Sequence, residues 1–250
     1  DKALALQPQN SGMHNARADL LFEIERFEDA ARDYEAVLAG RDPFPAYVHG
    51  YLMLCKLHAC DWAGLEERRR KVVAETQAGQ FTIDPLGLTL VSDSLAELRQ
   101  CSDVWRRSKY PEAPAPLWRG ERYTHERIRV AYISADLRMH ATAFLMAGVF
   151  ERHDRSRFET IALSSGADDR SPMRRRLEAA FGQFIDIRGK SDAEVAEAMR
   201  AMEIDIAVDL KGYTAEGRPG IFAQRPAPVQ AQYLGYPGTM ASEHYDYLIA

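Results

Sequence analysis

The sequence is poor in cysteine, in long apolar runs and in net positive charge. Three cysteines are present, Cys55, Cys60 and Cys101, and they form no CxxC pair. A set so sparse and odd in number argues against the disulfide framework of a secreted protein and favours a reducing, cytoplasmic location. The formal net charge of −5 provides no general attraction to nucleic acids or anionic membranes, so we expect neither as a partner.

Several functional signatures are also missing. No segment approaches the roughly 18 apolar residues of a membrane-spanning helix, and the first residues lack the charged and then apolar layout of a signal peptide. The GxGxxG, GxxxxGK(S/T) and GxSxG motifs are absent, which removes the usual nucleotide fingerprint, the P-loop and the nucleophile elbow. Cys55, His58 and Cys60 have no second pair at metal-ligand spacing, so we expect no bound metal.

Hydrophobic residues are abundant, and their spacing differs between the first and second parts of the chain. Of the 250 residues, 46% are hydrophobic, which is enough for a substantial core, and the length favours one large or two medium domains. The first residues have the pattern of a helix and the last ones that of a strand, so we expect a longer parent polypeptide. Residues 1–39 are rich in alanine and helical in period.

A tetratricopeptide-like pattern occupies this first segment. The residues that follow the order of that repeat are Ala30, Tyr34, Val37 and, one place late, Pro43. Ala3 precedes Val37 by one repeat length of about 34 residues, so the tail of an earlier unit is also present. The apolar face of the first long helix is expected to consist of Leu20, Leu21 and Ile24. The alternative is an ordinary alanine-rich helical hairpin.

Helical periodicity continues from Phe44 to Ala74 and again from Leu95 to Lys109. The charged run Glu66–Lys71 could bind phosphate, but acidic residues beside basic ones on a helix usually form a solvated face. A linker-like segment follows, residues 110–127, which contains Pro111, Pro114 and Pro116. We therefore divide the chain into a helical repeat region (1–109), a linker (110–127) and a second domain (128–250).

The second domain alternates strands with helices. The expected strands are a first one beginning at Ile128, then Phe158–Leu163, Phe184–Ile187, Ile204–Leu210, Val229–Leu234 and Tyr245–Ile249. The expected helices are Pro172–Phe181, with Arg174 to Arg176 on its exposed side, one opened by the Ser191–Glu194 capping box and continuing through Met202, and Gly220–Gln224. This order implies a parallel sheet with right-handed crossovers. The predicted fold class is therefore α-helical repeats followed by a Rossmann-like α/β domain.

The stretch IRVAYISADLRMHATAFLM, residues 128–146, provides the first functional candidate. His140 lies between the first strand and an apolar, buried helix whose N-cap is expected to be Thr142. In doubly wound α/β folds such loops lie outside the carboxyl ends of the strands, where ligands bind. A histidine there can act as a general base, because its ordinary pKa of ~6.5 is close to neutrality. A surface or structural histidine is the alternative.

Two further loops follow expected strands and should open on the same edge of the sheet. The first, DLKGYT, contains Lys211 and Tyr213, which could contact a polar ligand unless Lys211 is merely solvated. The second, LGYPGT, contains Gly235 and Gly238, which would let a ligand approach the main chain closely. Pro-Gly and Gly-Thr are also ordinary turn pairs, so a simple turn is the alternative.

Taken together, the strings IRVAYISADLRMHATAFLM, VDLKGYT, RPAPVQAQYLGYPGT and YDYLIA closely resemble the O-linked N-acetylglucosamine transferase family. Members of this family join tetratricopeptide repeats to a glycosyltransferase of the two-Rossmann-domain (GT-B) kind. The likeness is strong over Ile128–Ala250 and looser over the repeat region, including Cys60-Asp61-Trp62. The string RPAPVQ-x-x-x-LGYPGT is specific enough that chance is a poor explanation.

The resemblance implies transfer of N-acetylglucosamine from UDP-GlcNAc to Ser or Thr hydroxyls of proteins, with inversion and without a metal. An extended polypeptide acceptor would lie along the concave surface of the repeat superhelix. His140 maps onto the proposed catalytic base of the family, and base, orienter and acceptor contact are all open roles. The residues expected to bind the donor substrate are Leu234, Gly235, Tyr236, Pro237, Gly238, Thr239, Lys211 and Tyr213.

Some positions depart from the family. Asp205 stands where animal members have a second histidine once considered catalytic, and we assign it no catalytic role. Phe144 is apolar where the animal pattern is polar, so the acceptor preference is expected to differ. The second Rossmann domain, which holds most uridine and diphosphate contacts in the family, is absent from these 250 residues, so they are not expected to form a complete catalyst.

Three rival functions stay open at this point. A related protein glycosyltransferase of the SPINDLY type would use GDP-fucose, although Gly238-Thr239 weakly favours UDP-GlcNAc. A repeat scaffold that has lost catalysis would bind neither donor. A soluble α/β domain of unrelated function is the remaining alternative.

Overall fold

The structure is a computed structural model that describes residues 2–111 and 115–250. The chain divides into two compact units, Asp1–Ser108 and Lys109–Ala250. Pro114, part of the predicted linker, lies outside the described residues, as does Asp1. Within the described ranges no helix is both long and apolar enough to cross a membrane.

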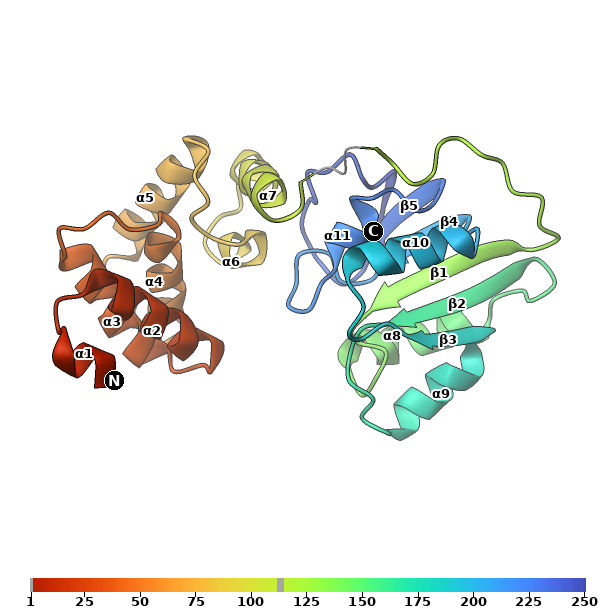
Figure 1. The fold of residues 1–250 in the computed structure, drawn as a ribbon, viewed down its shortest axis with the longest axis horizontal. Coiled ribbons are helices and arrows are strands. Elements are labelled where there is room, and N and C mark those ends of the chain that lie inside the picture. The colour runs from red at the N-terminus through yellow and green to blue at the C-terminus, as the bar shows by residue number, and fades with distance from the viewer. Residues whose placement is uncertain (1, 112–114) are drawn as a thin grey trace. The chain divides into compact units, whose positions relative to one another are not determined.

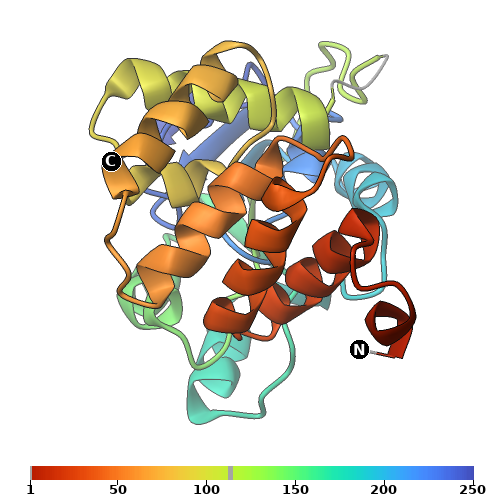
Figure 2. The same cartoon turned by 90° about the vertical axis from the view of Figure 1, so that its left-hand side faces the viewer.

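The first unit is built from helices joined by turns (Figures 1 and 2). Their bounds are α1 Lys2–Leu6, α2 Ser11–Glu23, α3 Phe27–Ala39, α4 Tyr47–His58, α5 Leu65–Gln77, α6 Pro85–Thr89 and α7 Leu95–Lys109. Helices α2, α3 and α4 each pack on the next helix along the chain. The helix expected at Leu95–Lys109 is therefore confirmed with the same bounds.

Small and aromatic side chains fill the core between α2, α3 and α4. Ala30, Tyr34 and Val37 of α3 are fully buried against Ala18 of α2. The expected apolar face of α2 was wrong in part, because Leu20 and Ile24 are exposed and only Leu21 packs against this core. The small Ala18 lies on the inner face of α2, together with the partly buried Leu21 and Phe22.

The second unit contains a six-stranded, wholly parallel sheet (Figure 1). The strands are β1 Ile128–Ser134, β2 Phe158–Ser164, β3 Gln183–Asp186, β4 Ile206–Asp209, β5 Val229–Tyr233 and β6 Tyr247–Ile249, in the order β3-β2-β1-β4-β5-β6. The predicted parallel sheet is confirmed. Strand β4 is shorter than expected, because the main-chain N–H of Ile204 donates to Met199 at the end of the preceding helix.

Helices cover both faces of this sheet. They are α8 Ala141–Glu151, α9 Pro172–Ala180, α10 Asp192–Ala201 and α11 Pro219–Phe222. Alternate residues of β1 point to opposite faces, so Val130 and Tyr132 pack with α8 and α9 whereas Ala131 and Ile133 pack with α10 and α11. Burial on both faces explains why β1 is a continuous apolar run.

Two expectations about the helices need correction, and one is confirmed. The capping box of Ser191 and Glu194 is present at the start of α10. Helix α8 is not fully buried, since Phe144 and Leu145 are exposed. Arg174 does not lie on an exposed side, because its side chain is buried.

The buried guanidinium of Arg174 ties three segments together. It donates to the carbonyl oxygen of Leu137 at 3.1 Å and to Ser164 Oγ at 2.8 Å. It also pairs with Glu178 at 2.8 Å and lies over the ring of Phe184. A run of three arginines gives no sign of which one turns inward, so this contact could not be seen in the sequence.

Replacing Arg174 with methionine should lower the free energy of unfolding by about 2 to 4 kcal/mol, because the Leu137 carbonyl and Ser164 hydroxyl lose a charged donor in a buried place. Chemical denaturation measures the change. Arg175→Met in the same helix is the matched control, since Arg175 is exposed, and it should change stability by less than about 0.5 kcal/mol. Equal effects of the two variants would contradict the assignment.

Candidate functional site

The structure brings three loops together at the carboxyl edge of the sheet. They follow β1, β4 and β5, which are neighbours in the sheet. In chain order, β2 and β3 are added on one side of β1, and β4 to β6 are added on the other side. The strand order therefore reverses between β1 and β4. In open α/β sheets the crevice at this reversal is where ligands bind. The candidate site therefore lies between the loops that leave β1 and β4.

A buried ion pair joins the loops that leave β1 and β4. The ammonium nitrogen of Lys211, in the loop after β4, lies 2.9 Å from Oδ2 of Asp136, in the loop after β1. Lys211 is 8% exposed and Asp136 is 3% exposed. The alternative that Lys211 is merely solvated is therefore wrong. An ammonium held by a buried carboxylate fixes the distance between the two loops.

His140 caps the helix that follows the first loop. It is the N-cap of α8, with an extended backbone, and its Nδ1 accepts the main-chain N–H of Thr142 at 3.2 Å. The prediction that Thr142 is the N-cap was wrong by two residues, because the histidine ring satisfies the helix terminus in its place. The side chain of His140 is 40% exposed, and its Nδ1 also lies 3.5 Å from Asp136 Oδ2.

The loop that carries His140 is held from the β2 side as well. The carboxylate of Asp169 accepts the main-chain N–H of Met139 at 2.8 Å, and this hydrogen bond lowers the pKa of Asp169. Arg174 binds the carbonyl of Leu137 in the same loop. Sequence reasoning identified neither contact. The partners lie far apart in the sequence, so no local sequence pattern could have revealed these contacts.

The LGYPGT loop divides into exposed and buried members. Leu234, Pro237 and Thr239 are exposed, and Leu234 has a positive φ of 68°. Tyr236 is buried, and its ring lies edge-on to the ring of Tyr213 at 5.6 Å between centroids. The two tyrosines thus join the second and third loops below the surface. The exposed residues are those that can reach a ligand.

Glycine at two positions of this loop is required by packing within the protein. A Cβ at Gly235 would lie 1.8 Å from the main-chain carbonyl oxygen of Leu210. At Gly238 a Cβ would lie 2.6 Å from the hydroxyl of Tyr236. The hydroxyl of Tyr213 is also occupied, since it donates to the carbonyl of Met240 at 2.9 Å.

A second buried carboxylate lies under the loop after β4. Asp209 Oδ1 accepts the main-chain N–H groups of Lys211 and Gly212, and its Oδ2 accepts the hydroxyl of Tyr245 at 2.6 Å. Burial raises the pKa of Asp209 despite these donors. Burial also raises the pKa of Tyr245, and the neighbouring carboxylate adds to this shift. Asp209 shapes the turn that presents Lys211 and was not singled out from the sequence.

Asp205 lies at the other end of the sheet. It precedes β4, and its carboxylate accepts the main-chain N–H of Arg129 at 2.8 Å. This places it at the amino edge of β4, whereas the three loops follow the carboxyl ends of their strands. The position supports our expectation of no catalytic role.

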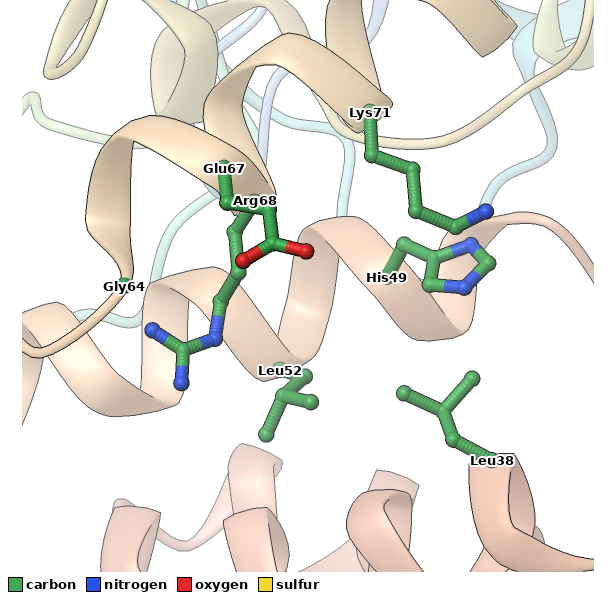
Figure 3. Close-up of a pocket in the computed structure, with 7 residues that line it drawn as sticks. All are labelled: Leu38, His49, Leu52, Gly64, Glu67, Arg68 and Lys71. Carbon is green, nitrogen blue, oxygen red and sulfur yellow. The ribbon is translucent and has the colours of Figure 1, made fainter.

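The helical unit contains a separate pocket of about 310 Å³ (Figure 3). Its lining residues are Leu38, His49, Leu52, Gly64, Glu67, Arg68 and Lys71. Three of these belong to the charged run that could have bound phosphate. Lys71 pairs with Glu75 at 3.3 Å, and Glu67 places an acidic group in the lining. Charges of both signs favour the solvated-face interpretation over a phosphate site.

The described residues, 2–111 and 115–250, contain no group of three or more His, Cys, Asp or Glu side chains placed to hold a metal. At the sheet edge Lys211 instead pairs with Asp136, and His140 accepts the main-chain N–H of Thr142. Such an arrangement offers donors and acceptors to a polar ligand.

A family model for glycosyl transferase family 41 matches residues 113–250. The chain belongs to this family. Its curated relatives include the probable UDP-N-acetylglucosamine–peptide N-acetylglucosaminyltransferase SEC of Arabidopsis thaliana, 32% identical over 171 residues, which cover 68% of this chain and 17% of the relative. The UDP-N-acetylglucosamine–peptide N-acetylglucosaminyltransferase of Caenorhabditis elegans is 34% identical over 138 residues, covering 54% of this chain and 12% of that protein.

Solved structures agree with this assignment. A mutant of the O-GlcNAc transferase of Thermobaculum terrenum superposes with a TM-score of 0.65 at 25% identity and covers 99% of this chain. The match spans 48% of that chain, and the curated relatives are longer still. The resemblance found in the sequence is thereby confirmed at the level of the family.

The glycine requirement at position 235 leads to a stability prediction for this family member. Gly235→Ala should lower the free energy of unfolding by about 2 kcal/mol or more, because main chain must move to admit the new Cβ. Gly148→Ala in α8 is the control, since its Cβ would meet only the flexible end of Arg152, and it should be neutral or stabilising by up to about 1 kcal/mol. Thermal or urea unfolding compares them, and an unchanged Gly235→Ala variant would refute the close approach.

The buried carboxylate of Asp209 leads to a pH prediction. Folding raises its pKa, so the folded state binds the proton more tightly, and stability is lost as the pH rises from about 4, the usual carboxyl value, through the folded-state pKa. Asp209→Asn cannot titrate. Its free energy of unfolding relative to the wild type should therefore increase with pH over this range. Urea unfolding at several pH values measures the difference, and a pH-independent difference would rule out the raised pKa.

Proposed function

We propose that this chain is the N-terminal part of a cytoplasmic protein O-GlcNAc transferase, which moves N-acetylglucosamine from UDP-GlcNAc to Ser or Thr hydroxyls of proteins with inversion. Family membership and the activities named for its relatives support the donor and the peptide acceptor. The observation that carries the proposal is the position of His140. It is half-exposed in the loop after β1, at the edge of the sheet where the strand order reverses.

The architecture proposed with it is tetratricopeptide-like repeats over residues 1–109, a linker over 110–127 and a Rossmann-like domain over 128–250. The burial of Ala30, Tyr34 and Val37 supports the repeat, because these are its consensus positions. The strand order β3-β2-β1-β4-β5-β6 supports the Rossmann-like half, since it is the order of dinucleotide-binding sheets. A second such half would complete a GT-B enzyme.

The reaction places clear demands on the site. A bond forms between the acceptor oxygen and the anomeric carbon while the bond from that carbon to the diphosphate breaks, and the electron pair leaves with UDP. The proton of the acceptor hydroxyl passes to an oxygen of the departing diphosphate or to a base on the protein. The acceptor must be aligned behind the anomeric carbon, and the departing charge must be stabilised. We propose that His140 contacts the reacting groups. The exposed Leu234, Pro237 and Thr239 would line the pocket for the sugar.

The remaining predicted residues receive supporting roles in this proposal. Lys211, Tyr213 and Tyr236 are buried, so we assign them to holding the three loops in register. The repeat surface would bind the polypeptide acceptor. No metal is needed, because the leaving group would be stabilised by basic residues of the second half.

His140→Ala in the full-length parent should reduce turnover of UDP-GlcNAc by about 10²-fold or more, whether the ring acts as a base or as a donor. Its melting temperature should change little, since one helix cap contributes only about 1 kcal/mol. Released UDP and labelled acceptor protein measure turnover.

His125→Ala is the matched control and should keep full activity. Its ring binds the carbonyl of Glu203, close to the amino end of β4. Wild-type turnover of His140→Ala would sink the assignment of His140.

Calorimetry with UDP-GlcNAc and GDP-fucose tests the donor: selective binding of GDP-fucose would identify the SPINDLY-type activity, and binding of neither would identify a scaffold.

A further inference from the structure

The helix cap determines which nitrogen of His140 carries the proton. The main-chain N–H of Thr142 can only donate, and it points to Nδ1 at 3.2 Å. Nδ1 must therefore present its lone pair, so the neutral ring carries its proton on Nε2. Within residues 2–111 and 115–250, no protein group forms a hydrogen bond with Nε2. The half-exposed ring thus offers an N–H group for a ligand.

Asp136 would favour the opposite arrangement. Its Oδ2 lies 3.5 Å from the same Nδ1, and a carboxylate can only accept a hydrogen bond. A bond between them would require the proton on Nδ1 and would leave Nε2 free to act as a base. Two partners therefore compete for one nitrogen, and each selects a different tautomer. The shorter contact, to Thr142, is within hydrogen-bond range, whereas 3.5 Å is beyond it.

Lys211 decides this competition. Its ammonium lies 2.9 Å from Asp136 Oδ2, the same oxygen that faces His140. In a buried setting, an ion pair of this kind strongly reduces the pull of the carboxylate on other donors. The other charged groups near His140 have partners of their own: Arg138 pairs with Glu216, and Asp169, in the loop after β2, accepts the main-chain N–H of Met139. Lys211 is thus the cation that neutralises Asp136.

We propose that His140 acts as a hydrogen-bond donor through Nε2–H, and that Lys211 is a positioning residue that maintains this tautomer by holding Asp136. The acceptor of the hydrogen bond is an oxygen of the sugar-nucleotide substrate. This choice of ligand rests on the proposed transferase function, whereas the tautomer does not. In this state Nε2 takes up no proton from the acceptor hydroxyl.

Long-range proton–nitrogen spectra of protein labelled with ¹⁵N in its histidine rings test the tautomer. The His140 signals are those that disappear in His140→Ala. We expect a protonated Nε2 and an unprotonated Nδ1 in the wild type at a pH where the ring is neutral. A proton on Nδ1 would overturn the proposal.

Lys211→Met tests the positioning role. Without the ammonium, Asp136 should attract the proton to Nδ1. The spectra of His140 should then show a protonated Nδ1 and an unprotonated Nε2. Asp136→Asn combined with Lys211→Met removes the carboxylate and should restore the wild-type pattern. If Lys211→Met does not fold, Lys211→Gln replaces it, because its amide keeps a bond to Asp136 without the charge. An unchanged tautomer in the folded variant would refute the role of Lys211.

Activity distinguishes a donor from a base. Glutamine can place an N–H near the position of Nε2 but cannot act as a base, and His140→Gln and His140→Ala both lose the ring that caps α8. We expect His140→Gln to recover about ten-fold or more of the turnover lost in His140→Ala. Equal loss in both would overturn the donor role. Absence of turnover in the wild type would instead refute the proposed transferase function and leave the measured tautomer standing.

Discussion

The parallel pairing of β1 with both β2 and β4 is the constraint on which the rest of the second unit depends. β2 and β4 pair with the two edges of β1, helices cover both of its faces, and the loop that follows it leaves at the carboxyl edge of the sheet. Strands β2 and β3 lie on one side of β1, and strands β4 to β6 lie on the other. A crevice at this edge follows from the topology. The chemistry of the site is then a question of which side chains the flanking loops supply.

The buried Asp136–Lys211 pair is a poor candidate for a stabilising device. Removing two charges from water costs several kcal/mol per ion, and an apolar pair of similar volume is often equally stable or better. The pair instead connects loops 75 residues apart in sequence and neutralises the charge beside His140. Arg174 and Asp169 hold the same loop from the β2 side. The catalytic role proposed for His140 requires a fixed orientation of its ring, and these contacts hold the loop that carries it.

The sequence allowed the sheet to be predicted because a strand buried on both faces is a continuous apolar run between turn residues. It also placed His140 and the LGYPGT segment after strands, and parallel topology alone brings such loops together. The individual side-chain contacts could not be predicted from the sequence. Nothing local distinguishes Arg174 from its exposed neighbours, and nothing near Lys211 shows that its partner is Asp136. The cap of α8 was misplaced because Thr142 has the usual capping side chain and histidine does not.

The division of the LGYPGT loop affects how substitutions there can be interpreted. Gly235 touches the carbonyl of Leu210 and Gly238 touches the ring of Tyr236, so a larger residue at either position must first displace protein. Loss of sugar-nucleotide binding in such a variant would therefore not show that the glycine contacts the sugar. Exposed Leu234, Pro237 and Thr239 can be changed without this displacement. Only their substitution separates contact with the ligand from the packing that shapes the pocket.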